Sequence, residues 1–125
     1  MILSLGTMAE ERLRLAAGAI EDKDVAVAKK IIATDYEIDQ MEVDVEEECL
    51  KILALYQPVA VDLRFLIAVI KINNDLERIA DEAVNIAQRV NNIAGRENAG
   101  FAFDYSTMAP RYRICFLVFS SSRCR

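Results

Sequence analysis

The feature that most constrains this chain is the scarcity of residues that end helices. Between Gly18 and Gly95 there is no glycine and a single proline, Pro58. Proline removes a backbone donor and glycine costs backbone entropy, so a stretch without them that is rich in Ala, Leu, Glu and Arg favours long helices. The spacing therefore predicts an all-α fold whose chain turns near Pro58.

Local signals set the predicted helix ends. Strong helix formers predict a first helix over residues 9–20. Asp22 or Asp24 offers an N-cap for a second helix, which extends to Tyr56 because the residue before a proline avoids the helical region. A third helix follows the proline and ends at residue 94, with the next glycine as its C-cap.

Apolar residues recur along the second and third predicted helices at steps of three, four or seven. They are Ile31, Ile38, Val45 and Ile52 in the second, and Ile72, Leu76, Ile79, Ala83, Ile86, Val90 and Ile93 in the third. Such a seam is typical of helices that pack along their length. We predict an antiparallel three-helix bundle with long second and third helices. A free-standing coiled coil is the alternative, disfavoured because Phe65, Leu66 and Val69 widen the apolar face.

Composition excludes several classes of function. The chain has no histidine, which removes Ser-His-Asp catalysis and His-ligated zinc. Twenty acids against fifteen bases give a net charge of −5, which argues against a nucleic-acid-binding surface. No nucleophile or acid–base set is apparent either, which is compatible with a protein that is not an enzyme.

The sequence carries no signal for export or for insertion into a membrane. The longest charge-free stretch of the helical part, residues 52–61, is interrupted by a proline and is too short to cross a bilayer. No basic segment marks a secretory signal at the N-terminus. Three widely spaced cysteines, at positions 49, 115 and 124, favour reduced thiols, with a bridge between Cys115 and Cys124 as the alternative. We therefore predict a cytoplasmic protein.

One kind of constellation could carry chemistry, namely two carboxylates four residues apart, which share a helix face. Four such pairs occur, and they are Asp35/Asp39, Glu42/Glu46, Asp44/Glu48 and Glu77/Asp81. Chance alone gives about three in a chain this acidic, so each pair by itself indicates a solvated face.

Hairpin geometry separates these pairs. If the second and third helices fold back at Pro58, residue i lies level with residue 115 − i. A single combination then brings four carboxylates to one height, and its members are Asp35, Asp39, Glu77 and Asp81. A hard or borderline cation such as Mg²⁺, Ca²⁺, Mn²⁺ or iron would relieve their repulsion through oxygen ligands. The alternative is a surface salt-bridge network with Lys29, Lys30 and Arg78.

Three segments make the sequence resemble a known family. They read Asp-Tyr-Glu-Ile-Asp at 35–39, Leu-Ala-Leu-Tyr-Gln-Pro-Val-Ala-Val-Asp-Leu-Arg at 53–64 and Asp-Leu-Glu-Arg-Ile-Ala-Asp-Glu-Ala-Val-Asn-Ile-Ala at 75–87. Through them the chain resembles the PhoU family of phosphate-transport regulators over roughly residues 3–109. It departs from the family at Ala80, where glycine is usual.

The resemblance implies a fold of tandem three-helix repeats and a role for the chain. Members act as cytoplasmic adaptors, membrane-associated through their partners, between a phosphate ABC transporter and its sensor histidine kinase. Some relatives hold iron or zinc clusters, which carried over implicates Asp35, Asp39, Glu77 and Asp81 as ligands of iron, zinc, manganese or magnesium. Other relatives lack metal, so a metal-free site is the alternative. A metal-binding carboxylate bundle and a purely structural interaction module remain as alternative functions.

The end of the chain departs from the family pattern. We divide the chain into one three-helix repeat over 1–95, a linker with the aborted start of a second repeat over 96–110, and a disordered or non-native tail over 111–125. That tail carries four arginines and no acid, whereas residues 1–110 have a net charge of −9. We interpret the chain as a single repeat, truncated relative to its family. The faces left uncovered predict a homodimer.

Overall fold

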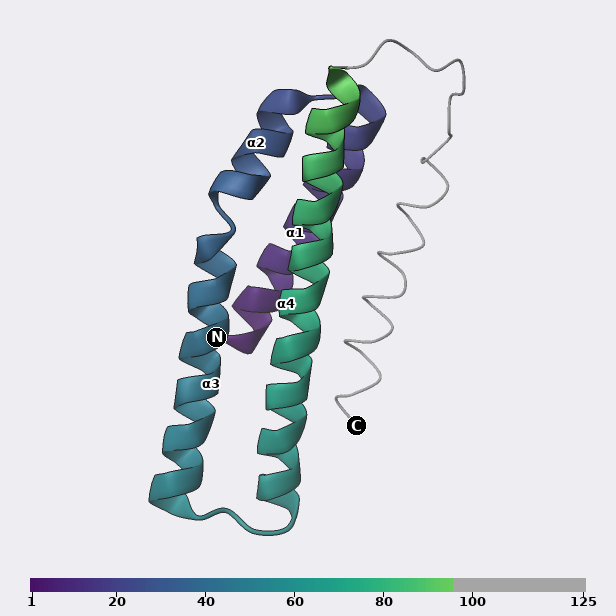
Figure 1. Ribbon diagram of the computed structural model, residues 1–125. Helices are drawn as coiled ribbons and strands as arrows, with labels where there is room; N and C mark the ends of the chain where they lie inside the picture. The colour runs from purple at the N-terminus through teal and green to yellow at the C-terminus, as the bar shows by residue number, and fades with distance from the viewer. Residues whose placement is uncertain (96–125) are drawn as a thin grey trace.

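The structure, a computed structural model, describes residues 1–95, so the segments 96–110 and 111–125 lie outside the described residues. The described part forms helices α1 (Ile2–Asp22), α2 (Val25–Ala33), α3 (Tyr36–Tyr56) and α4 (Val61–Ala94), without a strand. Helices α3 and α4 make an antiparallel hairpin, and α1 packs against it at the end away from the turn (Figure 1). The all-α bundle is as predicted, with α2 and α3 together in the place of its second helix. No helix among residues 1–95 is both long and apolar enough to cross a membrane.

Helix α1 starts earlier than the sequence predicts, at Ile2 instead of residue 9. Leu5 and Ala9 are both fully buried, one turn apart, where they contact a cluster that includes Leu76 of α4. Packing on α4 therefore stabilises about two additional turns that helix propensity alone leaves undecided.

The ends of the other helices follow the predicted signals. Asp24, and not Asp22, caps α2, because its Oδ1 accepts hydrogen bonds from the N–H of Ala26 at 2.9 Å and of Val27 at 3.2 Å. Helix α3 ends at Tyr56, two residues before the proline, and Gly95 is the C-cap of α4.

The prediction of one continuous helix up to Tyr56 is wrong at a single point. The helix is interrupted at Thr34 and Asp35, between α2 and α3. In a continuous helix the Thr34 carbonyl would accept from the N–H of Ile38, but that N–H donates to the Asp35 carbonyl instead, at 2.9 Å. The Thr34 carbonyl accepts from the N–H of Glu37, three residues on, at 3.1 Å, and also from the guanidinium of Arg12 on α1, so a tighter local bond and a tertiary contact take the place of the helical one.

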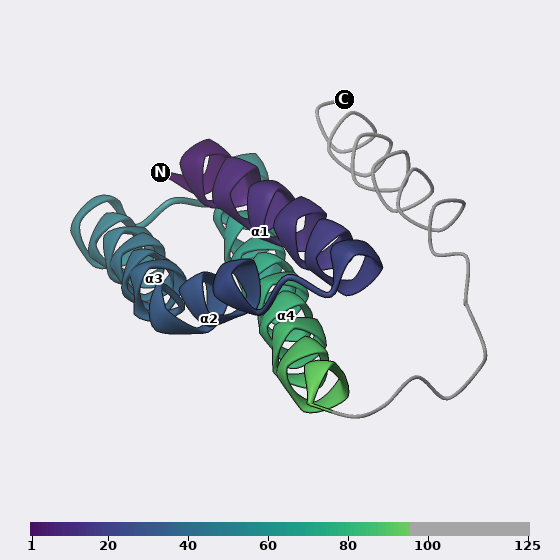
Figure 2. The same ribbon diagram turned by 90° about the horizontal axis from the view of Figure 1, so that it is seen from above.

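Alanine forms the contact between α1 and α4. Seen from above, α1 and the α2–α3 pair both lie against α4 (Figure 2). The buried alanines of the contact, each exposed by 2% or less, are Ala9, Ala16 and Ala19 on α1 and Ala80, Ala83 and Ala87 on α4. Side chains this small allow the two helix backbones to approach closely. The alanine at position 80, where the family usually has glycine, fits this contact with 1% exposure.

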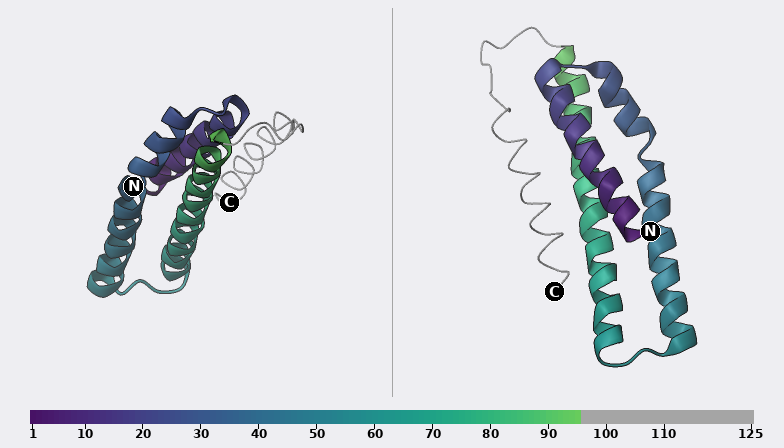
Figure 3. Two further views of the ribbon diagram at one scale, coloured as in Figure 1. Left: turned by 45° about the horizontal axis from the view of Figure 1, so that its top comes forward. Right: turned by 180° about the vertical axis from the view of Figure 1, so that it is seen from behind.

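Beyond α1, the hairpin continues as a two-helix arm. Figure 3 shows that the N-terminus of α1 lies part of the way along the hairpin, so the end near the turn is built from α3 and α4 alone. Its core is small, with Val45, Cys49 and Leu66 buried and Ile2 of α1 at its upper edge. Apolar side chains therefore remain exposed toward the turn.

We predict that Ala83→Leu destabilises the bundle. The added atoms have no space between α1 and α4, and overpacking of this kind costs about 1–3 kcal/mol of the free energy of unfolding. Urea denaturation followed by circular dichroism measures the change. Ala54→Leu, at an exposed position of α3, is the control and should leave stability nearly unchanged. Equal stability of both variants would contradict close α1–α4 packing.

Candidate functional site

The register of the hairpin can be read from one hydrogen bond. Asn73 of α4 is fully buried, and its Nδ2 donates to the Glu42 carbonyl of α3 at 3.0 Å. The two residue numbers add up to 115, which is the register that folding back at Pro58 predicts. Helices α3 and α4 therefore place side chains opposite each other as the sequence indicates.

The four predicted carboxylates lie within electrostatic range of one another at this register. The pKa of Asp35 is raised, first by burial and then by the charges of Asp39 and Asp81, against the opposing effect of Arg12. The pKa of Glu77 is raised by burial, by Asp81 and by Asp39. Asp81 raises the pKa of Asp35, and Asp39 raises the pKa of Glu77, so the hairpin holds the four carboxylates within electrostatic range of one another.

The cluster is larger than the quartet that the sequence selects. Burial and the charges of Glu46 and Asp39 raise the pKa of Glu42, and Glu42 in turn raises the pKa of Glu77. Glu42 was set aside in the sequence because no acid lies directly level with it. Its acidic neighbours lie about one turn away along both helices, and a comparison of residues at the same level of the hairpin does not include them. The acid surface thus follows α3 for about two turns.

A buried amide adds an unsatisfied acceptor to this surface. The Oδ1 of Asn73 is buried and has no hydrogen-bond partner among the described residues, while its Nδ2 lies 3.4 Å from Glu42 Oε1. Asn73 precedes Glu77 by four residues and therefore shares its helix face. An amide oxygen beside carboxylates is a ligand that suits hard cations.

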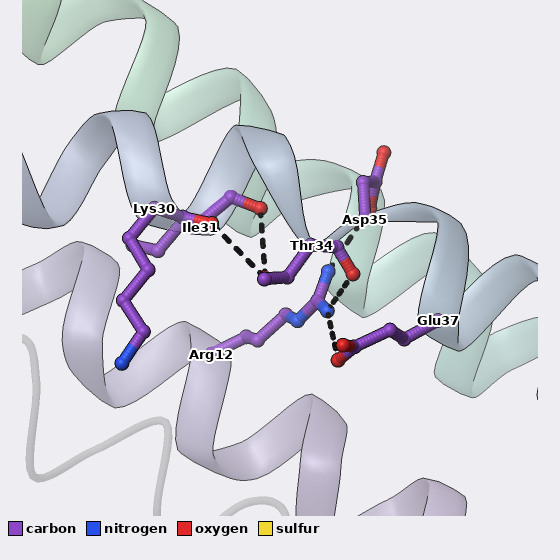
Figure 4. Close-up of polar contacts among 6 residues, drawn as sticks. All are labelled: Arg12, Lys30, Ile31, Thr34, Asp35 and Glu37. Carbon is purple, nitrogen blue, oxygen red and sulfur yellow. Dashed lines mark hydrogen bonds and ion pairs between the residues drawn. The ribbon is translucent and has the colours of Figure 1, made fainter.

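A base that the sequence does not indicate lies at the other end of the cluster (Figure 4). The Arg12 side chain is 7% exposed, and its Nη1 contacts Asp35 Oδ1 at 3.3 Å while Nη2 lies 3.7 Å from Glu37 Oε2. The same guanidinium donates to the Thr34 carbonyl. The alternative salt-bridge network, with Lys29 or Lys30 near Asp35 and Arg78 level with Glu37, is wrong in its bases among residues 1–95, where both acids pair with Arg12. No local signal could have identified it, because Arg12 is 23 residues away in sequence.

The oxygen atoms of this cluster are chemically suited to bind a hard cation, but their present arrangement is less well suited to it. The cluster offers carboxylates of raised pKa and one unpartnered amide oxygen, all oxygen atoms. In the part of the chain that the structure describes, no three acidic or thiol side chains converge closely enough to hold an ion. Asp39 and Asp81 are exposed, so the groups fit a cation whose binding reorients side chains. A role of Asp35, Asp39, Glu77 and Asp81 as ligands stays a prediction.

Fold and site together define a helical bundle that bears an acidic cluster between two long helices. The family model for the PhoU domain matches residues 2–90. A phosphate-specific transport system accessory protein PhoU homolog from Aquifex aeolicus is 41% identical over 88 residues, covering 70% of this chain and 40% of its own. The homolog from Pseudomonas aeruginosa is 42% identical over 88 residues, covering 36% of its own length. The crystal structure of PhoU from Pseudomonas aeruginosa superposes with a TM-score of 0.88 at 30% identity, over 96% of this chain and 60% of that one.

These matches show that the chain belongs to the PhoU family. The chain spans less than half the length of the curated relatives it matches, 40% and 36% in the two above. The family assignment made from the three sequence segments is confirmed, and the matched range reaches from the start of α1 almost to the end of α4.

We predict that Arg12→Met destabilises the fold. The change removes one of the two donors to the Thr34 carbonyl and leaves Asp35 without its counter-charge, and the loss of hydrogen bonds to a charged group of this kind costs about 1–3 kcal/mol. Urea denaturation at pH 7 measures the loss. Arg14→Met, an exposed position on the same helix, is the control. If both variants lose equally little, the guanidinium does not stabilise the α2–α3 junction.

We also predict a pH dependence that comes from the cluster. A carboxyl whose pKa is raised in the folded state binds its proton more tightly there than in the unfolded chain, so its contribution to stability falls as the pH rises through the raised pKa. Glu77→Gln removes this loss and should raise the free energy of unfolding at pH 7 by about 0.5 kcal/mol. The gain should shrink as the pH falls below the ordinary glutamate range. Glu11→Gln, exposed on α1, should show neither effect, and a pH-independent gain for Glu77→Gln would contradict the electrostatic explanation.

Proposed function

We propose that this chain is a regulatory accessory component of phosphate uptake. In this role it is a cytoplasmic adaptor, held at the membrane by its partners, between a phosphate ABC transporter and its sensor histidine kinase. The observation that carries the proposal is the family match over residues 2–90, together with relatives whose names describe accessory proteins of phosphate-specific transport. A rigid helical hairpin with long exposed faces is compatible with an adaptor, because such faces can bind partners without a catalytic site.

A starvation reporter tests this function. In the native cell, deletion of the gene should raise expression of a phosphate-starvation promoter in phosphate-replete medium, and the full chain supplied in trans should restore repression. Ala83→Leu, which changes the buried contact between α1 and α4 and none of the acidic side chains, serves to separate loss of protein from loss of function when protein levels are measured by immunoblot. A reporter that stays low after deletion would count against the proposal.

We propose cation binding by Asp35, Asp39, Glu77 and Asp81 as a second function of the same domain. The observation that favours it is that burial and mutual repulsion raise the pKa of Asp35 and Glu77, while Arg12, which pairs with Asp35, is the one base that forms an ion pair with the quartet among residues 1–95. The Asn73 Oδ1 and the Glu42 carboxylate are further oxygen donors at hand. Iron, zinc, manganese and magnesium are the candidates. When bound, the ion would neutralise the cluster and fasten α3 to α4.

Thermal unfolding with and without added metal tests this site. For chain purified without a metal-affinity step, Mn²⁺ at one hundred times its Kd should stabilise the fold by about 2.7 kcal/mol, and EDTA should reverse the gain. The double variant Asp39→Asn/Asp81→Asn should lose the response. The double variant Asp44→Asn/Glu48→Gln, a pair of the same spacing outside the quartet, is the matched control. A response that both double variants retain would show that Mn²⁺ acts elsewhere.

We propose further that the chain forms a homodimer. Tyr36, Val43 and Leu50 of α3 are spaced by seven residues and are 67%, 44% and 53% exposed, which leaves an apolar stripe along one helix. A stripe of this spacing is suited to a second helix. Light scattering on the full chain should give a dimer, and Val43→Glu should give a monomer. A monomeric wild-type chain at micromolar concentration would contradict the dimer.

A further inference from the structure

The end of the α3–α4 hairpin, residues 50–65, carries the densest exposed apolar surface of the described chain. We refer to this segment as the hairpin tip. Its apolar side chains that are exposed by 68–77% are Leu55, Tyr56, Val59, Val61 and Phe65. Together they expose on the order of 500 Å² of apolar surface, which is at the upper end for a monomer and indicates a binding surface.

The charge of the hairpin tip differs from that of the remaining described chain. Residues 50–65 contain the bases Lys51 and Arg64 and the acid Asp62, a net charge of +1, whereas the other residues of 1–95 contain 17 acids and 8 bases, a net charge of −9. Neither Asp62 nor Arg64 forms an ion pair with any residue from 1 to 95. Aromatic residues and arginine with few carboxylates are the composition that protein interfaces favour at their centre.

The shape of the hairpin tip is that of a fixed knob. Leu55 and Tyr56 are consecutive on α3 and therefore project about 100° apart, so the apolar surface surrounds the end of the hairpin and is not a flat stripe. The turn places Gln57 at φ 45° and Ala60 at φ 51°, a backbone region in which residues other than glycine are uncommon. Positions held in this region define one turn shape, which fixes how Val59 is presented.

We propose that the hairpin tip inserts into an apolar pocket, rimmed by carboxylates, on the transport machinery that this chain serves. The proposal rests on the proposed regulatory function and names the surface that would perform it. A concave pocket is required because the tip is convex, and carboxylates at the rim would pair with Arg64. Two convex tips would share little area, so a second copy is a poorer occupant. A bilayer is poorer as well, because Lys51 is already paired with Glu47 and Glu48, at 3.9 and 3.7 Å, and these acids would face anionic lipid.

Binding to the purified phosphate ABC transporter in nanodiscs, measured by biolayer interferometry with the full chain, tests the proposal. Phe65→Asp and Val59→Asp should each weaken binding by about 30-fold or more, the loss typical of a central interface residue. Val59 lies in the turn, outside the helices, so its variant should retain the fold even if Phe65→Asp does not. Leu3→Asp, at an 80% exposed apolar position of α1, is the matched control and should bind within about threefold of wild type.

The possible outcomes separate the two proposals. Wild-type binding that is lost in both tip variants and kept in the control supports the hairpin tip as the docking surface. Binding that both tip variants retain overturns the tip and leaves the regulatory function standing. No binding by wild type overturns the proposed partner and the tip with it. Wild-type binding to empty nanodiscs, or a wild-type dimer that the tip variants alone dissociate in light scattering, also overturns the proposal, because it assigns the tip to lipid or to a second copy.

Discussion

One guanidinium joins the parts of the fold at the point where the second arm of the bundle leaves the helical path. The Thr34 carbonyl there loses its helical donor and accepts instead from the N–H of Glu37, at 3.1 Å, and from the guanidinium of Arg12. Arg12 at the same time contacts the carboxylates of Asp35 and Glu37. The junction matters because α2 and α3 belong to different parts of the core. Helix α2 packs with the alanine contact of α1 and α4, whereas α3 packs with Leu5 and Leu76.

The same junction links stability to the acidic cluster. Asp35 is the second residue of the interruption, and Arg12 contacts one of its oxygen atoms. The remaining carboxylates of the cluster have no such base among residues 1–95, and burial together with mutual repulsion raises the pKa of Glu77 and Glu42. Folding thus places charge where it is unfavourable. An arrangement of this kind is common at functional sites, where stability is given up for an interaction with something outside the chain.

Much of this structure follows from residues near one another in the sequence. The Asp24 cap, the end of α3 before Pro58 and the end of α4 at Gly95 are local signals, and the hairpin register follows from the position of a single proline. The interruption at Thr34 was not predicted, because the apolar seven-residue repeat continues through it, although Thr34 and Asp35 are weak helix formers and Arg12 on another helix contacts the break. The early start of α1 at Ile2 was missed because it depends on packing against a distant helix. Of the site, the sequence selected the quartet, whose role as ligands stays a prediction, whereas Glu42 and Asn73 required the packed helices.

Helix α4 experiences two environments along its length. From about Leu76 onward it is enclosed by α1, α2 and α3, but near the turn it has α3 alone as a neighbour, and Val61 and Phe65 there are mostly exposed. Local opening depends on the apolar contacts that it breaks, so the free energy of opening should decrease along one unbroken helix toward the turn. Backbone amides near Ala83 would then exchange with solvent at a rate set by global unfolding. Those near Phe65 would exchange faster, at a rate set by fraying of the two-helix arm. The protein thus combines a stable anchor with an arm whose helices open more easily, while the turn at the end of that arm keeps one backbone shape.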